Sequence, residues 1–325
     1  MRRREFITIL GGAAAWPIAA GAQATLDTLP VIGTWTGGPT SMTDAIAVSR
    51  NGQFVLGVYY GGAVLWEVQR GRPATMLEGH NGGVKGVAFL GDGWRAVTAD
   101  KQREVIVWEI PSGRRVGSWV ANVDDLERLT ASPDGRHVAT AGFDDNSIRV
   151  WDVTTGRQIW TRDGRTGWTT ALSYSLDGKL VVSGQRNSVA LWDASNGSPV
   201  AEVPMEAQVW AASISPDNSL VAVAKHDMIW IVDIKTRRRT VSIRPPTGTE
   251  SWFQDVAFLP NGRQVAAVDV KGRTLIGAIA GNEFAAKAPD TSAVPWRIAI
   301  SPDGTRAYVG LYNGAIQVLD ISSLL

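Results

Sequence analysis

The residues best suited to chemistry near neutral pH are the three histidines, because an imidazole can bind a metal ion or transfer a proton there. They are His80, His137 and His226, and no His-x-His or His-Glu-x-x-His spacing relates them. Residues 143–146, Phe-Asp-Asp-Asn, could suggest calcium, but aspartate and asparagine are ordinary in a turn before a strand. The chain has no cysteine, which removes thiolate ligands, disulfides and covalently attached haem. The sequence therefore predicts no catalytic residue, no metal site and no cofactor.

An aromatic binding surface is a second chemical possibility, because tryptophan offers a wide apolar ring with one polar edge. Four of the 14 tryptophans precede the end of a recurring turn by eight or ten residues, namely Trp168, Trp210, Trp252 and Trp296. The two offsets have the same parity, so in an unbroken strand these side chains point to the same face. We expect them to form an aromatic arc that binds a partner. The charged residues expected beside this arc are Arg165, Glu206, Glu250 and Arg297.

Packing in the core is the alternative interpretation of these tryptophans, because apolar residues of the same and other repeats share their parity. Those residues are Val87, Phe89, Ile214 and Phe258. The exposure of the tryptophan rings would decide between the two interpretations.

The recurring turn divides the chain into units of similar length. Its seven copies, of which Ser-Pro-Asp-Gly is the clearest form, end at Gly52, Gly93, Gly135, Gly178, Asn218, Gly262 and Gly304. Consecutive copies are 40 to 44 residues apart. Each turn lies between two short apolar segments, and a third, alternating segment and a shorter fourth one follow. Four short strands in about 42 residues are typical of one blade of a β-propeller.

The third strand of the first four repeats ends in tryptophan followed by an acidic residue. These pairs are Trp66-Glu67, Trp108-Glu109, Trp151-Asp152 and Trp192-Asp193. Together with the turns they resemble the WD-repeat β-propellers, and the resemblance covers residues 25–325. It implies an all-β, seven-bladed β-propeller with four antiparallel strands in each blade. Because the last repeat ends after its third strand, we expect residues 30–36 to close the ring as the outer strand of the last blade.

One feature of that family is expected to be incomplete here. In WD repeats a Gly-His pair commonly hydrogen-bonds through an aspartate and a serine or threonine to the tryptophan of the blade. Only Gly79-His80 matches the pair, with Thr98 and Trp108 as its expected partners. Gln102 stands where the resemblance places the aspartate, so we expect the second repeat to lack the complete network.

A second resemblance concerns the segment Trp-Asp-Val-Thr-Thr-Gly-Arg-Gln-Ile-Trp at residues 151–160. Its Asp152, Thr155, Gly156 and Trp160 look like the tryptophan-docking motif of quinoprotein dehydrogenases. Those enzymes repeat the motif in most blades, whereas only one good copy is visible in this sequence. An ordinary turn between two strands is therefore the preferred interpretation.

Residues 1–24 have the composition of an export signal rather than of the propeller. An arginine cluster precedes a mildly apolar stretch, and Ala22-Gln23-Ala24 supplies a cleavage site near Ala24. The segment Arg3-Arg4-Glu5-Phe6-Ile7 resembles the bacterial twin-arginine signal, which predicts a periplasmic protein. A retained membrane anchor is the alternative. The rest of the chain carries 29 Lys and Arg against 30 Asp and Glu, so its charge does not predict nucleic acid as a partner.

These observations favour a binding scaffold over an enzyme. We expect a non-enzymatic, monomeric scaffold that binds a protein partner, with no nucleic acid and no membrane span in the mature chain. The alternative is a periplasmic propeller enzyme, either a lactonase-like hydrolase or a quinone-dependent dehydrogenase.

Overall fold

The computed structural model describes residues 26–36, 38, 43–121, 126–142, 145–163, 168–245, 251–289, 291 and 293–325. Strands dominate these residues, and the described helices are two 3-10 turns, Ile279–Gly281 and Ser322–Leu324. No helix in the described part of the chain is long and apolar enough to cross a membrane. The predicted signal segment, residues 1–24, lies outside the described residues.

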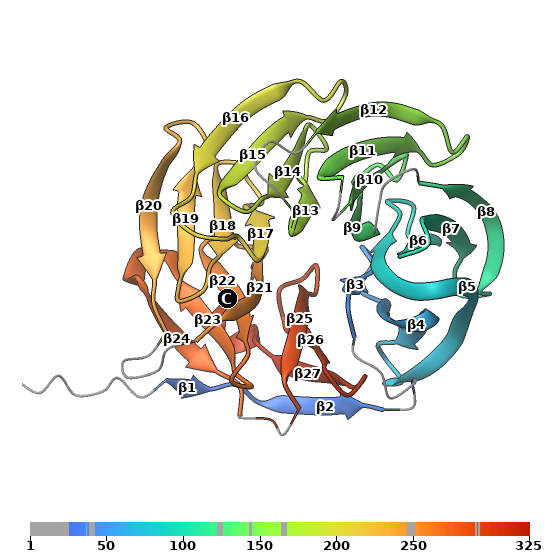
Figure 1. The fold of residues 1–325 in the computed structure, drawn as a ribbon. Helices are drawn as coiled ribbons and strands as arrows, with labels where there is room; N and C mark the ends of the chain where they lie inside the picture. Colours follow the sequence, from blue (N-terminus) through green and yellow to red (C-terminus); the bar gives the residue numbers. More distant parts are fainter. Residues whose placement is uncertain are drawn as a thin grey trace, which may run out of the picture.

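The described strands form sheets that stand around a common centre, as in a β-propeller (Figure 1). Three of these sheets contain four consecutive antiparallel strands each. The first contains β9 (Leu126–Ala131), β10 (His137–Gly142), β11 (Ser147–Asp152) and β12 (Gln158–Asp163). The second contains β13 (Ala171–Tyr174), β14 (Leu180–Gly184), β15 (Ser188–Asp193) and β16 (Pro199–Pro204). The third contains β17 (Ala211–Ile214), β18 (Leu220–Ala224), β19 (Ile229–Asp233) and β20 (Arg238–Ile243).

The remaining three sheets depart from this simple arrangement. The sheet of the last repeat contains β25 (Pro295–Ile300), β26 (Arg306–Leu311), β27 (Ile316–Asp320) and β2 (Val31–Trp35). The five-stranded sheet contains β21 (Phe253–Phe258), β22 (Gln264–Asp269), β23 (Thr274–Ala278), β24 (Glu283–Lys287) and β1 (Asp27–Thr28). The six-stranded sheet contains β3 (Ile46–Val48), β4 (Phe54–Glu67), β5 (Arg72–Phe89), β6 (Arg95–Asp100), β7 (Glu104–Glu109) and β8 (Arg114–Val120).

The all-β propeller is confirmed, but the prediction of seven blades is wrong, because the described strands form six sheets. The first two repeats share the six-stranded sheet. Its strands β4 and β5 are 14 and 18 residues long, whereas the strands of the other sheets have at most six. The first part of β5 pairs with β4 and its last part pairs with β6. The outer strand of the first repeat thus continues into the inner strand of the second without a break.

The recurring turn forms the first hairpin of each repeat through its side chains. In the third repeat the Asp134 carboxylate accepts a hydrogen bond from the backbone N–H of Arg136 at 3.0 Å, and the hydroxyl of Ser132 accepts one from the N–H of His137 at 3.0 Å. Gly135 has a φ of 70°, a value that favours glycine. The same two contacts recur in the fourth, fifth and seventh repeats, which explains why the sequence motif marks the repeat length so clearly.

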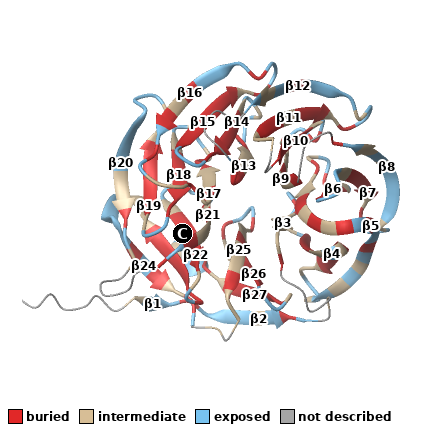
Figure 2. Ribbon diagram, in the orientation of Figure 1, coloured by how far each residue is buried: buried red, intermediate tan, exposed pale blue. Residues whose placement is uncertain are grey.

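The core lies between neighbouring sheets rather than within any one of them. Buried residues concentrate on the middle strands, whereas the outermost strands β8, β12, β16 and β20 are largely exposed (Figure 2). Leu191 of β15 packs with Val221 and Val223 of the next sheet in one buried cluster. Stability therefore comes from apolar contacts that each sheet makes with both neighbours.

The predicted closure by the N-terminal strand is confirmed. Strand β2 pairs antiparallel with β27 of the last repeat, with Trp35 opposite Ile316. Trp35 stacks on Trp66 of the first repeat at 5.8 Å between ring centroids. The preceding strand β1 pairs with β24 of the sixth repeat, a contact that the sequence did not predict. The N-terminal segment therefore joins both ends of the ring.

Tryptophans on outer strands dock against glycines of the next repeat. The ring of Trp160 covers Gly197 so closely that a Cβ there would lie 2.7 Å from it, and its Nε1 donates to the carbonyl of Ala194 at 2.8 Å. Trp119 covers Gly156, and Trp35 covers Gly71, in the same way. The expectation of a single tryptophan-docking copy is therefore too low, because the contact recurs at three boundaries between repeats in the described part of the chain.

Candidate binding site at the mouth of the central channel

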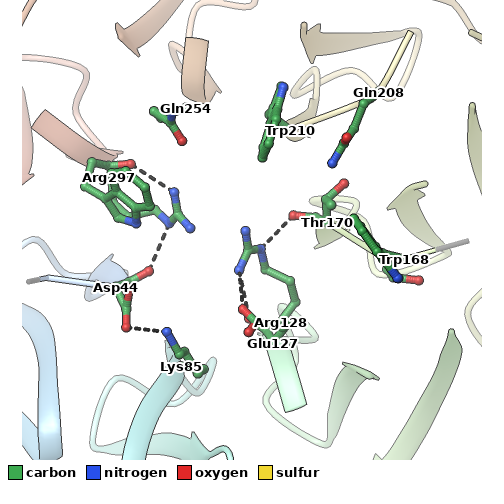
Figure 3. Close-up of a pocket in the computed structure, with 12 residues that line it drawn as sticks. Asp44, Lys85, Glu127, Arg128, Trp168, Thr170, Gln208, Trp210, Gln254 and Arg297 are labelled. Carbon is green, nitrogen blue, oxygen red and sulfur yellow. Dashed lines mark hydrogen bonds and ion pairs between the residues drawn. The ribbon is translucent and has the colours of Figure 1, made fainter. Parts of the chain in front are cut away.

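A cavity of about 340 Å³ opens at one end of the ring, beside the starts of the innermost strands (Figure 3). Its lining residues come from all seven repeats and are Asp44, Lys85, Glu127, Arg128, Trp168, Thr169, Thr170, Gln208, Trp210, Gln254, Trp296 and Arg297. A second space of about 140 Å³ shares several of these residues and adds Asp255. We call the two together the channel mouth.

The register of the repeats explains why these side chains meet. Each repeat contributes to the lining the residue that lies eight positions before the end of its turn. These residues are Asp44, Lys85, Glu127, Thr170, Trp210, Gln254 and Trp296. Because the repeats surround one axis with their innermost strands towards it, equal positions in the repeats face the same opening.

Three of the four predicted tryptophans line this cavity. Trp168 is 45% exposed, and Trp210 and Trp296 are half-buried. Trp296 is held edge-on by Tyr312 at 6.2 Å between ring centroids. None of the three belongs to the buried core, so each ring presents apolar surface to the opening.

Of the other described residues predicted for the arc, only Arg297 lines the cavity. Trp252 is 47% exposed and packs against His226 at 3.8 Å between ring centroids, outside the cavity lining. Arg297 lines the cavity, whereas Glu206 is exposed and does not. Arg165 and Glu250 lie outside the described residues. The structure therefore brings together Trp168, Trp210, Trp296 and Arg297 from the predicted set.

Charged side chains that the sequence analysis missed form the rest of the channel mouth. Lys85 and Asp44 form an ion pair at 2.6 Å between Nζ and Oδ2. Nε of Arg128 donates to the carbonyl of Thr170 at 2.7 Å. Nε of Arg297 donates to the carbonyl of Asp44 at 2.9 Å. The shared position relative to the turn could have found Asp44 and Lys85, because the same offset marks Trp210 and Trp296.

Burial perturbs the ionisable groups of this region. Burial, together with the positive charge of the nearby Arg297, lowers the pKa of Arg128 to about 10. Burial also raises the pKa of the Asp255 carboxyl, although the nearby Arg297 acts in the opposite direction. These shifts indicate that Arg128 and Asp255 are poorly solvated.

The histidine of the second repeat has an aspartate beside it, contrary to the sequence-based expectation. Nε2 of His80 lies 2.6 Å from Oγ1 of Thr98, which also accepts a hydrogen bond from Nε1 of Trp108 at 2.7 Å. Nδ1 of His80 lies 3.2 Å from Oδ2 of the buried Asp100. Asp100 therefore takes the place that was assigned to Gln102, which instead hydrogen-bonds an exposed backbone carbonyl.

The remaining residues that the sequence singled out make contacts with other protein groups. The carboxylate of Asp145 accepts hydrogen bonds from the backbone N–H and hydroxyl of Ser147 and pairs with Arg149 at 3.0 Å, as a turn residue would. His137 begins β10 opposite Asp152. Asp100, Glu104 and His80 are close enough together to suggest a metal site, but both ring nitrogens of His80 already face protein groups.

Comparison with known proteins gives two family matches. Residues 144–311 match the family model described as outer membrane protein assembly factor BamB, and residues 114–152 match the WD domain, G-beta repeat. The chain is 25% identical to the WD repeat-containing protein SL1-17 of Schistosoma mansoni, over 59% of this chain and 65% of that protein. It is 24% identical to autophagy-related protein 16 of Arabidopsis thaliana, over 77% of this chain and 50% of that protein.

A third relative is the small ribosomal subunit protein RACK1 of Caenorhabditis elegans, which is 24% identical over 54% of this chain and 68% of that protein. The matched regions span less than two thirds of the Schistosoma and Arabidopsis proteins. The family matches and these relatives agree with the repeated sheets and the histidine network. Residues 114–152 and these relatives make the chain similar to WD-repeat proteins, and the chain belongs to the family described as outer membrane protein assembly factor BamB, whose model matches just over half of it.

Proposed function

We propose that this propeller is a non-enzymatic scaffold whose channel mouth binds a protein partner. The observation that carries the proposal is the convergence of Trp168, Trp210 and Trp296, from three different repeats, on one opening. Partly exposed tryptophans are enriched among the residues that contribute most to protein binding. Trp296 lies within β25, and Trp168 and Trp210 lie just before β13 and β17, so the sheets of the ring position all three rings before a partner binds.

The names of two relatives support a role in assemblies. One is the small ribosomal subunit protein RACK1 and another is the guanine nucleotide-binding protein subunit beta of Arabidopsis thaliana, and both names describe subunits of larger complexes. We propose that this chain is itself a monomer without a nucleic-acid partner, because its ring is closed and its charge is nearly balanced.

We also propose export to the periplasm. The paired arginines Arg3 and Arg4 before the apolar stretch support it, as does a family description that names outer membrane protein assembly. Replacing both arginines with lysine should leave the full-length precursor in the cytoplasm, whereas the wild type should appear shortened in the periplasmic fraction. Unchanged export of the double variant would exclude the twin-arginine route.

Site-specific photo-crosslinking tests the binding surface in the cell. A photoreactive amino acid at Gln208, which lines the cavity, should form adducts with a partner. The same group at the exposed Lys179, on the turn between β13 and β14, serves as the control and should form none. Adducts at Lys179 alone would place the binding surface elsewhere.

An enzymatic alternative has one observation in its favour. The tryptophan-on-glycine contact recurs at three boundaries, and the sequence around Trp160 resembles the motif of quinone-dependent dehydrogenases. A quinone absorbance band in the purified protein, together with dye reduction by a substrate, would favour the dehydrogenase. Cleavage of lactones by the purified protein would favour the hydrolase.

A further inference from the structure

Two guanidinium groups face one another across the channel mouth, although they come from distant parts of the chain (Figure 3). Backbone carbonyls hold both of them in place. Arg128 donates from Nε to Thr170 and from Nη1 to the carbonyl of Glu127 at 2.8 Å. Arg297 donates from Nε to Asp44 and from Nη1 to the carbonyl of Trp296 at 2.9 Å.

Each guanidinium keeps a donor that the protein does not use. Among the residues that the structure describes, no acceptor hydrogen-bonds to Nη2 of Arg128 or of Arg297. Neither Nη2 atom belongs to the buried polar atoms that lack a partner, so both remain accessible from the cavity. The Arg128 side chain as a whole is 24% exposed. Two unused donor groups therefore point into one small space.

The charges around this space are balanced in number but unevenly placed, since Asp255, which lies near both arginines, accepts hydrogen bonds from backbone N–H groups instead. Lys85 and Asp44 neutralise each other at 2.6 Å. Glu127 lies 3.5 Å from Nη1 of Arg128, and no described carboxylate lies within ion-pair distance of Arg297. The two arginines repel each other, which helps to lower the pKa of Arg128. A negative charge placed between them would relieve this repulsion.

We propose that the channel mouth binds a carboxylate of the partner, an aspartate or glutamate side chain in an extended peptide segment, between Arg128 and Arg297. The planar guanidinium fork suits the two oxygens of a carboxylate. The inference rests on the proposed function, since it names the group by which a protein partner is held.

The surroundings favour a single carboxylate with an apolar neighbour. Three basic and three acidic side chains line the channel mouth and balance in number, so a single carboxylate between the two arginines adds less uncompensated negative charge than a dianionic phosphate would. Trp168 and Trp210 line the same cavity as the two arginines and offer apolar surface to the residue next to the acid (Figure 3). A cavity of about 340 Å³ has room for side chains rather than for a folded element.

Selection from a random peptide library tests this inference with the purified exported protein. Peptides that bind the wild type should share an aspartate or glutamate at one position, next to an aromatic or branched aliphatic residue. A resynthesised peptide should bind the Arg128→Gln/Arg297→Gln variant at least ~10-fold more weakly. The Lys235→Gln/Arg238→Gln variant removes the same charge from the exposed outer edge at β20 and should bind like the wild type.

Competition by small anions and a second arginine variant distinguish a carboxylate from other ligands. Acetate should compete with the peptide at least as well as inorganic phosphate, and stronger competition by phosphate would overturn the assignment to a carboxylate. If the double glutamine variant does not fold, Arg297→Lys keeps the charge but loses the fork, and it should still weaken binding. Bound peptides without a shared acid would overturn this inference and leave the scaffold intact. Absence of both peptides and crosslinked partners would overturn the scaffold as well.

Discussion

His80 shows how burial at one residue sets a pH dependence for the whole chain. Burial lowers its pKa below the ordinary value, so the folded state resists protonation. The unfolded chain takes up that proton near pH 6.5, and stability therefore falls as the pH drops through this value. Above it the histidine is neutral in both states and has no effect.

The predicted loss of stability at low pH can be tested by urea unfolding at about pH 7.5 and about pH 5.5. The wild type should lose more free energy of unfolding between the two values than the His80→Gln variant. The difference should be at most about 1.4 kcal/mol for each pH unit below 6.5. His137 and His226 are present in both proteins, so their contributions cancel. Equal losses would mean that His80 is not held neutral by its surroundings.

Single residues were harder to place from the sequence than the repeats themselves. The resemblance put the partner of His80 at Gln102, but Asp100, the last residue of β6, lies beside His80 instead. Counting along the motif therefore misplaced the aspartate by two residues. Arg128 and Arg297 meet only because distant repeats surround one axis. A single strand pattern does not reveal such a meeting.

At the scale of the element, two turn glycines show that backbone strain and contact with a tryptophan ring can be measured separately. Gly178 and Gly197 both have a φ near 70°, so alanine is strained at either position. A Cβ at Gly178 would meet only Pro133 at 3.6 Å, whereas one at Gly197 would meet the Trp160 ring at 2.7 Å. Docking of Trp160 therefore adds a steric cost at Gly197 alone.

We expect Gly178→Ala to lower the free energy of unfolding by about 1 to 2 kcal/mol. Gly197→Ala should lower it by about 1 to 3 kcal/mol more, because the tryptophan has to move. Thermal or urea unfolding of the two variants measures the difference. If both variants lose the same free energy, the tryptophan does not hold the two repeats together.

The element boundaries show why the blade count was mispredicted. Residues 79–83, Gly-His-Asn-Gly-Gly, are typical of a loop, and the turns on either side suggested two separate blades. In the structure β5 runs through them and pairs with β4 and then with β6. Glycine permits an extended backbone as well as a turn, so composition alone could not decide between them.

At the scale of the molecule, closure depends on one short strand far from the last repeat in sequence. Trp35 in β2 is buried against Trp66 and Tyr308, whereas Ile32 in the same strand is 50% exposed. Trp35→Ala should lower the free energy of unfolding by about 3 to 5 kcal/mol. Ile32→Ala should change it by less than about 0.5 kcal/mol. Similar values for both would show that the ring does not depend on this closure.

The ring and its closure were predictable because the repeat length and the missing fourth strand are properties of the whole sequence. The binding surface was predictable only in part. A shared strand position identified Trp210 and Trp296, but Trp252 turned away to pack on His226. That choice depends on the loop that carries His226, which no periodic pattern describes.

The most direct test of the account is the affinity of the purified partner for three forms of the propeller. The Trp168→Ala/Trp210→Ala/Trp296→Ala variant should bind at least ~100-fold more weakly than the wild type, because it loses the aromatic surface of the channel mouth. Trp252→Ala removes an equally exposed ring outside the cavity and should bind within about 2-fold of the wild type. Unchanged affinity of the triple variant, with its fold confirmed by circular dichroism, would contradict the claim that this mouth is the binding surface.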